Sequence, residues 1–487
     1  MDHLGVGLED EMKHEDDEPT TPITRVSIHP KHNHVIHCVI GFKNSIDVAA
    51  LKHELSMSIM IKIPRFSSLL VVDPHDGTEQ WKRTHVNLDN HIFIHHEHGH
   101  EVHDHDHEPM SDEDAINSYL ADIAILEPMS LDKPLWELHI MHAQKCLILR
   151  VHHAVADGMS LMSLLWSLDD SSIRNVHDDG GRHHDVMMVS NNKNYHGVKG
   201  RSSKNMGMWE GLMFIWYSLV SVLKFIARFL WVKDKQTVIS GIQGVEFWPR
   251  KVTTAKFQIG DMKTIKKAIP NATVNDVLYG ILWCGLTRYL NSQHPTALRD
   301  GVQFTGLCPV NLRERPGVQE VSTMLSDLTT SWGNKFVMLL LPIIYSKRDM
   351  GALAYTARAK AVMDRKKRSM EARLCYKVGR LVFNCLGSKV GDLYYNLFSN
   401  TSFLVSNIAG PEKEISIASN PVNFIRVTSS SQPHAITLHM VSYAGKADLQ
   451  IQVAKEVIHD PEFLAKCFED ALLEMKKDAD NCAATKY

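Results

Sequence analysis

The chain has 487 residues, of which 44% are hydrophobic and 22% are charged, and its formal net charge at pH 7 is -3. This composition excludes a disordered chain, and the length favours two lobes over a single hydrophobic core. The small net charge supplies no basic field, and the spacing of a helix-turn-helix or a zinc finger is absent, so we predict no nucleic-acid partner.

The beginning of the chain predicts a cytosolic setting. Residues 1–24 are rich in acidic side chains and lack the apolar segment of a signal peptide, so we expect an acidic, mobile N-terminus. The eight cysteines contain no Cys-x-x-Cys pair, and several lie in apolar runs. That pattern is typical of free thiols in a reducing compartment, so the body of the protein should face the cytosol.

Residues 25–177 predict a first lobe of mixed α/β structure. A helix is expected over residues 48–61, and a second helix begins after Ser111, with Asp114 three residues later as in a capping box. Residues 136–140 and 145–151 read as paired strands.

The second of these strands leads into the most informative motif of the chain, His152-His153-Ala154-Val155-Ala156-Asp157-Gly158. An imidazole titrates near pH ~6.5 when unperturbed, so a neutral histidine in the cytosol can take a proton from a hydroxyl group. The motif therefore favours acyl transfer with a histidine as general base. A simpler alternative is a structural histidine pair, with Asp157-Gly158 as a turn and helix cap.

Residues 178–244 predict a linker followed by a membrane-binding helix. Residues 178–204 are polar and aperiodic, whereas residues 207–232 are apolar and aromatic at helical spacing. The longest uncharged stretch, residues 211–223, is shorter than the ~20 apolar residues that span a bilayer. We expect residues 207–232 to lie in a membrane interface, with Lys224 and Arg228 reaching the headgroups. A buried core helix and a tilted membrane span remain alternatives.

Residues 245–480 predict a second lobe. Thr273 is a helix cap with Asp276 at the third helical position, so Asn275-Asp276 marks either a helix start or the support of a site. Pro461 opens a final helix at the favoured first position.

A histidine-rich segment interrupts the first lobe. Eight histidines lie between His91 and His107, interleaved with acidic residues. Such a run could bind a divalent metal weakly, but it reads as a solvated loop without rigid ligands, so we predict no functional metal site.

Six short motifs occur along the chain in a fixed order: Pro64-Arg65-Phe66-Ser67-Ser68, Pro134-Leu135-Trp136, the histidine motif, Asn275-Asp276, Pro309-Val310-Asn311-Leu312-Arg313, and Ser406-Asn407-Ile408-Ala409-Gly410-Pro411. The histidine motif resembles the His-His-x-x-x-Asp-Gly signature of the CoA-dependent acyltransferase superfamily. The six together resemble the plant-type wax ester synthase/diacylglycerol acyltransferase family. The resemblance implies an α/β (α+β) fold of two chloramphenicol-acetyltransferase-like lobes, with an active-site tunnel at their interface.

The resemblance also implies a reaction and its residues. A long-chain acyl group would pass from acyl-CoA, a substrate rather than a cofactor, to a long-chain alcohol or to diacylglycerol. His153 would be the proton acceptor, supported by His152, by Gly158 at the channel mouth, and by Asp157, which would pair with an arginine such as Arg313. The channel would be shaped by Pro134, Leu135 and Trp136 and supported by Asn275 and Asp276. For Pro134-Leu135-Trp136, the alternative is a rigid strand start with a buried tryptophan.

Two rival functions stay open at this point. One is the plant acyltransferase group with the shorter His-x-x-x-Asp motif and another hydroxylated acceptor, although its Asp-Phe-Gly-Trp-Gly string is absent from this chain. The other is a non-catalytic, membrane-associated protein that keeps the fold. The resemblance and the lipid substrates favour the cytosolic face of the endoplasmic reticulum membrane, with the plasma membrane second.

Overall fold

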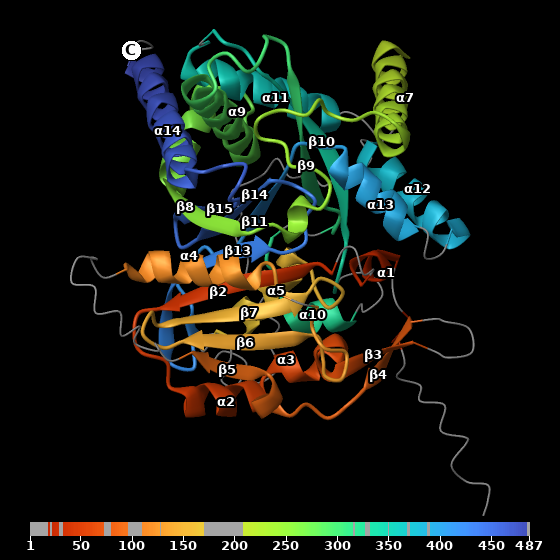
Figure 1. Cartoon of the computed structure of the whole chain (residues 1–487), viewed down its shortest axis with the longest axis vertical. Coiled ribbons are helices and arrows are strands. Elements are labelled where there is room, and N and C mark those ends of the chain that lie inside the picture. The colour runs from red at the N-terminus through yellow and green to blue at the C-terminus, as the bar shows by residue number, and fades with distance from the viewer. Residues whose placement is uncertain are drawn as a thin grey trace, which may run out of the picture.

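The computed structural model of the chain describes residues 18–19, 22–28, 33–72, 79–95, 110–126, 128–169, 208–314, 317–326, 332–348, 350–367, 371–386 and 390–484. Two six-stranded sheets form the cores of two lobes, one above the other in Figure 1.

The sheet of the N-terminal lobe has the strand order β12-β13-β2-β7-β6-β5. Its strands are β12 (Ser416–Ile417), β13 (Asn420–Ser429), β2 (Val35–Phe42), β7 (Cys146–His152), β6 (Trp136–Met141) and β5 (Ile92–His95). Neighbouring strands are antiparallel except β5 and β6, which are parallel. A small sheet, β1 (Glu18–Pro19), β4 (Glu79–Arg83) and β3 (Ser68–Val72), lies beside it.

The sheet of the C-terminal lobe has the order β10-β9-β11-β14-β15-β8. Its strands are β10 (Phe336–Ile344), β9 (Gln303–Asn311), β11 (Phe403–Ala409), β14 (Ile436–Tyr443), β15 (Lys446–Ala454) and β8 (Arg250–Gln258). Strand β11 is parallel to both of its neighbours, and the other pairs are antiparallel.

Helices cover the sheets and bury their apolar faces. The first half of the chain forms α1 (Pro22–Ser27), α2 (Val48–Met57), α3 (Ile59–Lys62), η1 (Pro64–Ser67), η2 (Leu88–Asn90), α4 (Asp112–Ile123) and α5 (Gly158–Ser167). The remainder forms α7 (Met208–Leu230), η4 (Val245–Phe247), α8 (Ile259–Ala268), α9 (Val274–Gln293), α10 (Val321–Ser326), α11 (Ala352–Lys367), α12 (Glu371–Leu386), α13 (Val390–Ser399) and α14 (Pro461–Ala484).

Local signals place several elements as predicted. Ser111 caps α4 by accepting a hydrogen bond from Asp114 N, and Pro461 is the first residue of α14. The expected strand pair is β6 and β7, which run antiparallel with Trp136 opposite Val151. Strand β7 is buried at every residue, because α4 covers one of its faces and α5 lies on the other side of the sheet.

One segment departs from the expected division into consecutive lobes. Strand β13 belongs to the second half of the chain, yet it pairs with β2, with Ser429 opposite Ile36. The segment from β12 to β13 therefore completes the N-terminal sheet, and the prediction that residues 245–480 form one lobe is wrong at this point. Strand pairing between segments so distant in sequence leaves no local pattern from which to predict it.

The predicted boundary at residue 25 falls inside α1, because Pro22 begins a helix that ends at Ser27. In addition, Glu18 and Pro19 pair with β4, so this part of the acidic N-terminus joins a sheet. The linker predicted over residues 178–204 lies outside the described residues.

Helix α7 lies at the edge of the C-terminal lobe, against α12 and α13 (Figure 1). Its inward side is partly polar: Ser218 and Arg228 are 7% and 9% exposed. Arg228 Nη2 lies 2.7 Å from Asp234 Oδ1, and Nη1 donates to Asn400 O at 3.0 Å. The expectation that Arg228 reaches lipid headgroups is therefore wrong, because this side chain anchors the helix to the protein.

The outward side of α7 is apolar. It exposes Trp209, Leu212, Ile215, Trp216, Leu219, Leu223, Ile226 and Leu230. In the part of the chain that the structure describes, neither α7 nor another helix has the length and hydropathy needed to cross a membrane.

Candidate active site

The histidine motif forms a tight loop between β7 and α5. His152 N donates to Leu135 O at 3.0 Å, and Val155 N donates to His152 O at 2.9 Å. The His152 ring is buried, and Ala154 N donates to its Nδ1 at 3.1 Å. Burial lowers the pKa of His152 to about 3, so its imidazole is neutral and serves as a hydrogen-bond acceptor that shapes the loop.

His153 is half-buried where this loop meets the C-terminal lobe. Its backbone N–H donates to His34 O at 2.7 Å, and its ring lies 5.7 Å from that of Phe336 at the start of β10. Burial lowers the pKa of His153, and the charge of Asp157, a hydrogen bond of the ring to its own backbone and a hydrogen bond to Asn334 oppose part of that shift. The ring is therefore neutral at cytosolic pH, the form required of a proton acceptor.

Asp157 is fully engaged in holding the loop. Its carboxylate accepts Ser160 N at 2.9 Å as the cap of α5, and it accepts Lys335 N at 3.2 Å. Arg313 approaches it in bidentate fashion, with Nη1–Oδ2 at 2.8 Å and Nη2–Oδ1 at 3.0 Å. Burial alone would raise the pKa of Asp157, but the charge and hydrogen bonds of Arg313 lower it. The predicted pairing of Asp157 with Arg313 is confirmed, and so is its reading as a helix cap.

Gly158 allows the two lobes to approach. A Cβ atom at this position would lie 2.7 Å from Ile408 Cδ1 of β11. A larger side chain would require Ile408 or the start of α5 to shift. The glycine thus permits a close approach of α5 to β11. Its role at the channel mouth stays a prediction.

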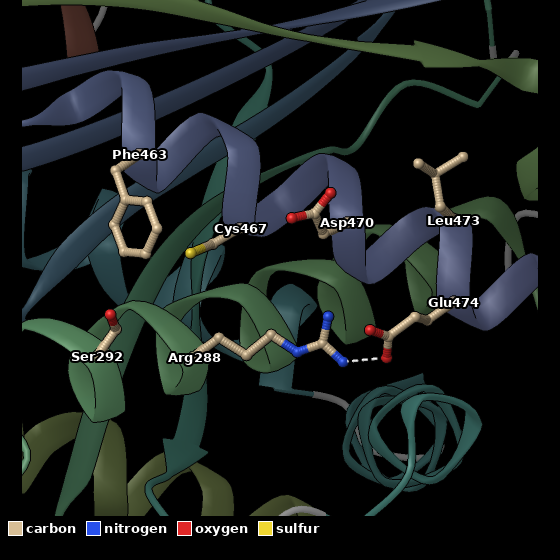
Figure 2. Close-up of a pocket in the computed structure, with 7 residues that line it drawn as sticks. All are labelled: Arg288, Ser292, Phe463, Cys467, Asp470, Leu473 and Glu474. Atoms are coloured by element: carbon tan, nitrogen blue, oxygen red, sulfur yellow. Dashed lines mark hydrogen bonds and ion pairs between the residues drawn. The ribbon is translucent and has the colours of Figure 1, made fainter.

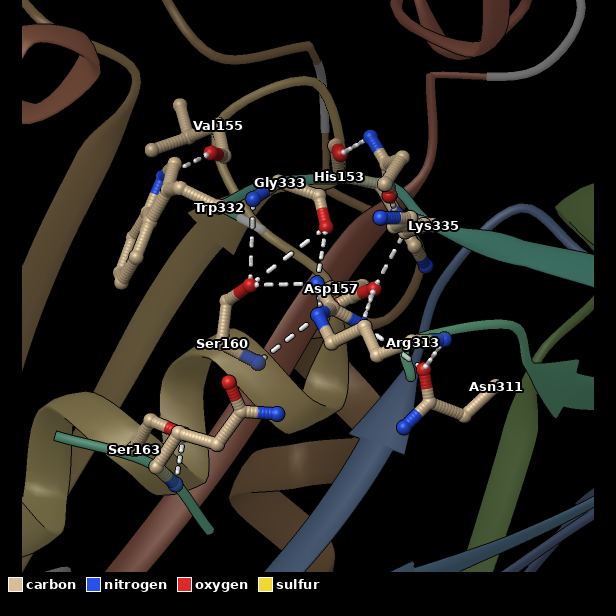
Figure 3. Close-up of polar contacts among 12 residues, drawn as sticks. His153, Val155, Asp157, Ser160, Ser163, Asn311, Arg313, Trp332, Gly333 and Lys335 are labelled. Carbon is tan, nitrogen blue, oxygen red and sulfur yellow. Dashed lines mark hydrogen bonds and ion pairs between the residues drawn. The ribbon is translucent and has the colours of Figure 1, made fainter. Parts of the chain in front are cut away.

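A segment that the sequence reasoning missed holds the loop from the C-terminal lobe (Figure 3). Each of its four residues, Trp332, Gly333, Asn334 and Lys335, bonds to the loop or to the first turn of α5, and we call it the 332–335 strap. Trp332 Nε1 donates to Val155 O at 3.2 Å, and Gly333 N donates to Ser160 Oγ at 3.2 Å. The sequence contains only a weak signal for this strap, namely a glycine before a strand. Gly333 adopts a φ of 83°, a conformation that favours glycine.

Pro134, Leu135 and Trp136 support the loop through the core of the lobe. Leu135 and Trp136 are buried, and the Trp136 indole donates to Phe66 O at 2.8 Å. The indole also stacks on His91, with ring centroids 4.0 Å apart. These contacts favour the alternative of a rigid strand start with a buried tryptophan over the predicted role in a channel.

Asn275 and Asp276 have different roles. Asp276 forms a capping box with Thr273, whose N donates to Asp276 Oδ2 at 2.7 Å, and this confirms the helix-start interpretation. Asn275 instead accepts a hydrogen bond from Asn407, the neighbour of the residue that contacts Gly158. It links α9 to β11 and so supports the site from a distance.

The histidine-rich segment is partly built into the sheet. His91 bonds Trp136 O through Nδ1 at 2.7 Å, and His95 ends β5, where Tyr119 Oη lies 2.8 Å from its Nε2. These two residues therefore differ from the predicted solvated loop, and residues 96–109 lie outside the described chain. Among the described residues, three or more His, Cys, Asp or Glu side chains nowhere gather in a way that could hold a metal ion.

A surface pocket of about 360 Å³ lies between α9 and α14 (Figure 2). Arg288 and Glu474 form an ion pair across it. Its lining residues come from these two helices and include none of the histidine loop or the 332–335 strap, so we assign it no part in the site.

Solved structures share the two-lobed fold of this chain. A wax ester synthase/diacylglycerol acyltransferase from Marinobacter aquaeolei superposes with a TM-score of 0.57 at 14% identity, covering 95% of this chain and 100% of the other. A trichothecene 15-O-acetyltransferase from Fusarium sporotrichioides gives 0.58 at 10% identity, over 94% and 95% of the two chains. The fold is therefore that of the two-lobed acyltransferases, as predicted.

Sequence comparison identifies the family. Residues 120–278 match the wax ester synthase/diacylglycerol acyltransferase catalytic domain, and residues 332–476 match the WS/DGAT C-terminal domain. Wax ester synthase/diacylglycerol acyltransferase 10 of Arabidopsis thaliana is 31% identical over 95% of this chain and 97% of its own length. Its paralogue 7 is 29% identical over 96% and 98%. The chain belongs to the wax ester synthase/diacylglycerol acyltransferase family, which confirms the resemblance seen in the six motifs.

Proposed function

We propose that this protein is an acyl-CoA-dependent O-acyltransferase that moves a long-chain fatty acyl group to a long-chain alcohol, to diacylglycerol, or to both. The single observation that carries the proposal is His153, a neutral imidazole held between the two lobes by Asn334 and Phe336. Family membership and the names of the relatives supply the substrate classes.

In this mechanism the reaction needs no covalent enzyme intermediate. His153 takes the proton of the acceptor hydroxyl while the oxygen attacks the thioester carbonyl carbon. The tetrahedral adduct collapses with rupture of the carbon–sulfur bond, and the His153 imidazolium returns the proton to the departing CoA thiolate. The products are the ester and free CoA, and the imidazole is regenerated, so neither a metal nor a cofactor enters the balance.

The other loop residues act through His153. Asp157 has no free role as a base, because Arg313, Ser160 and Lys335 already occupy its carboxylate. His152 accepts a backbone hydrogen bond at Nδ1 and, with its lowered pKa, stays neutral, so it has neither a free acceptor nitrogen nor an imidazolium proton to give. We therefore assign proton transfer to His153 alone.

The test is product analysis with labelled palmitoyl-CoA, offering hexadecanol and diacylglycerol in parallel to membranes that carry the full chain. Labelled wax ester or triacylglycerol above the level of control membranes is the expected result, and the ratio of the two defines the acceptor. Absence of both products from folded protein, across several acyl and alcohol chain lengths, would favour a different hydroxylated acceptor or the non-catalytic alternative.

A second proposal concerns where the enzyme meets its lipid substrates. We infer that α7, within residues 207–232, lies on the cytosolic face of a membrane, that of the endoplasmic reticulum first and the plasma membrane second. The support is its inverted polarity: Ser218 and Arg228 face the protein, while large apolar side chains face away from it. Exposed Trp209 and Trp231 at the two ends suit the headgroup region, where tryptophan is favoured.

We expect loss of membrane binding when the outward side is made polar. The variant replaces four outward residues with serine: Leu212, Trp216, Leu219 and Leu223. Each Å² of apolar surface lost weakens the free energy of membrane binding by ~25 cal/mol, and the anchoring Arg228 is unchanged. The measurement is the fraction of protein that floats with liposomes of neutral and anionic lipid. The matched control replaces four exposed apolar residues on other elements, Met57, Val72, Leu126 and Leu131.

The outcome has a defined alternative. Seven of the outward residues follow a spacing of three and four residues, which also suits pairing with a second helix. If the α7 variant floats as well as the native chain but changes from a dimer to a monomer, the outward side of α7 binds a second copy of this chain and not a membrane.

A further inference from the structure

We propose that Asn334 is the positioning residue that fixes the protonation of the general base, a role that the carboxylate of the histidine motif does not have. The proposal rests on the proposed function of His153. It assigns to the 332–335 strap a part in the chemistry beyond holding the loop.

The first step is the orientation of the Asn334 amide. Its Nδ2 atom lies 2.6 Å from the backbone oxygen of His153, and its Oδ1 atom lies 2.9 Å from His153 Nδ1. A carbonyl oxygen only accepts hydrogen bonds, so the amide NH₂ group must face His153 O. The amide oxygen is thereby directed at the ring.

The second step is the tautomer of the ring. An amide oxygen only accepts, so His153 Nδ1 carries the hydrogen that completes this contact. A neutral imidazole has one such hydrogen, which leaves Nε2 with a free lone pair. The ring also bonds its own backbone, and Asn334 adds the side-chain acceptor that holds the hydrogen on Nδ1. Together they favour the tautomer in which Nε2 can accept the hydroxyl proton.

The third step is that Asp157 cannot perform this function. Four residues after His153, it would be the natural carboxylate partner of the base in a Ser-His-Asp type arrangement. Arg313, Ser160 N and Lys335 N occupy its oxygens instead (Figure 3). The partner of the ring thus comes from the strap, 181 residues further along the chain.

An amide differs from a carboxylate in its effect on basicity. A carboxylate at Nδ1 would favour the imidazolium form and raise the pKa of His153, whereas a neutral amide orients the ring with a weaker effect. The amide therefore agrees with a half-buried base whose pKa is lowered. The orientation is rigid, because neighbouring Gly333 and Lys335 are bonded to Ser160 and Asp157.

The test compares Asn334→Asp, Asn334→Ala and the native chain across pH. In Asn334→Asp, a carboxylate meets Nδ1–H, so the acidic limb of kcat/KM should move upward by about one pH unit or more. In Asn334→Ala, one of the two hydrogen bonds that favour the protonated ring is lost, so the acidic limb should move downward. The fall in kcat of the alanine variant should be roughly 10- to 100-fold, a part of the ~10²–10⁴ that a general base contributes.

The matched control is Asn420→Ala. The Asn420 side-chain amide also bridges backbone groups: it accepts a hydrogen bond from Asn44 N at 3.2 Å and donates one to Asn44 O at 3.0 Å. It lies at the end of the N-terminal sheet that is away from the site. Its removal should leave the pH limb unchanged.

A readout that needs no acyl transfer separates this inference from the proposed function. Diethyl pyrocarbonate modifies neutral imidazole, so the rate of His153 modification against pH, followed by mass spectrometry, reports the pKa of the ring directly. Opposite shifts in the two Asn334 variants support the inference even if no ester forms. Shifts in the same direction, or none, would overturn it. Should the alanine variant fail to fold, the near-isosteric aspartate variant alone decides, since an absent upward shift contradicts the role.

Discussion

Replacing His153 with alanine is expected to lower ester formation by ~10²–10⁴-fold, the range that a positioned general base contributes. The loss should appear mainly in kcat, because the imidazole acts in the proton-transfer step. The substitution leaves the binding surfaces for the acyl chain intact. His153 is half-buried at the start of the loop, and its backbone N–H, which stays in the variant, bonds to His34 O, so the fold should survive.

The pH dependence of the native chain provides a second check. Because burial lowers the pKa of His153, the acidic limb of kcat/KM should lie below the ordinary histidine value of ~6.5, and activity should be level at neutral pH. His434, which is more deeply buried and has a pKa lowered to about 3, serves as the control for loss of a buried imidazole. Equal loss of activity in His434→Ala would remove His153 from its assigned role. Unchanged lipid products in His153→Ala would favour a non-catalytic protein.

Replacing Arg313 with methionine is expected to lower the free energy of unfolding by about 3–5 kcal/mol, because it leaves the buried carboxylate of Asp157 without its counter-charge. The same change removes the hydrogen bonds from Arg313 to Ser160 Oγ and to Gly333 O. Activity should fall with stability, since the loop and the strap are both held by this guanidinium.

The sign of the pH effect follows from the lowered pKa of Asp157. Its contribution to stability is present above the unfolded carboxyl value of ~3.9 and is lost as the pH falls through the folded value. The measurement is the urea midpoint of native and variant chains at neutral pH. Arg288→Met is the control: it breaks an exposed pair with Glu474, which should cost ~1 kcal/mol or less. Equal effects in the two variants would contradict the role of the buried pair.

Local chemistry explains which parts of the fold could be predicted. The Ser111 and Thr273 side chains cap helices by accepting the backbone N–H three residues later, and Pro461 begins a helix because its missing N–H is not needed there. Such signals act within one turn and are visible in a short window of sequence.

The parts that could not be predicted depend on tertiary contacts. Asn334 carries no pattern of its own, and only the folded chain brings it to His153. For α7, the sequence showed a polar and an apolar stripe but not which one faces the protein. That choice depends on Asp234, which pairs with Arg228 and fixes the polar stripe inward. The pairing of Asp157 with Arg313 was within reach because the family motif names both segments.

The crossing of β13 into the N-terminal sheet governs the order in which this protein can fold during synthesis. Strand β2 lies between β7 and β13 and is buried along its whole length in the finished sheet. Its second edge has no partner until the ribosome has released Ser429, almost 400 residues after β2 emerges. An unpaired apolar strand edge invites aggregation, and pairing at such sequence separation is slow. We therefore expect the nascent N-terminal lobe to expose this edge for most of its translation, and a chain truncated before β13 to form an incomplete sheet even though the histidine motif is already present.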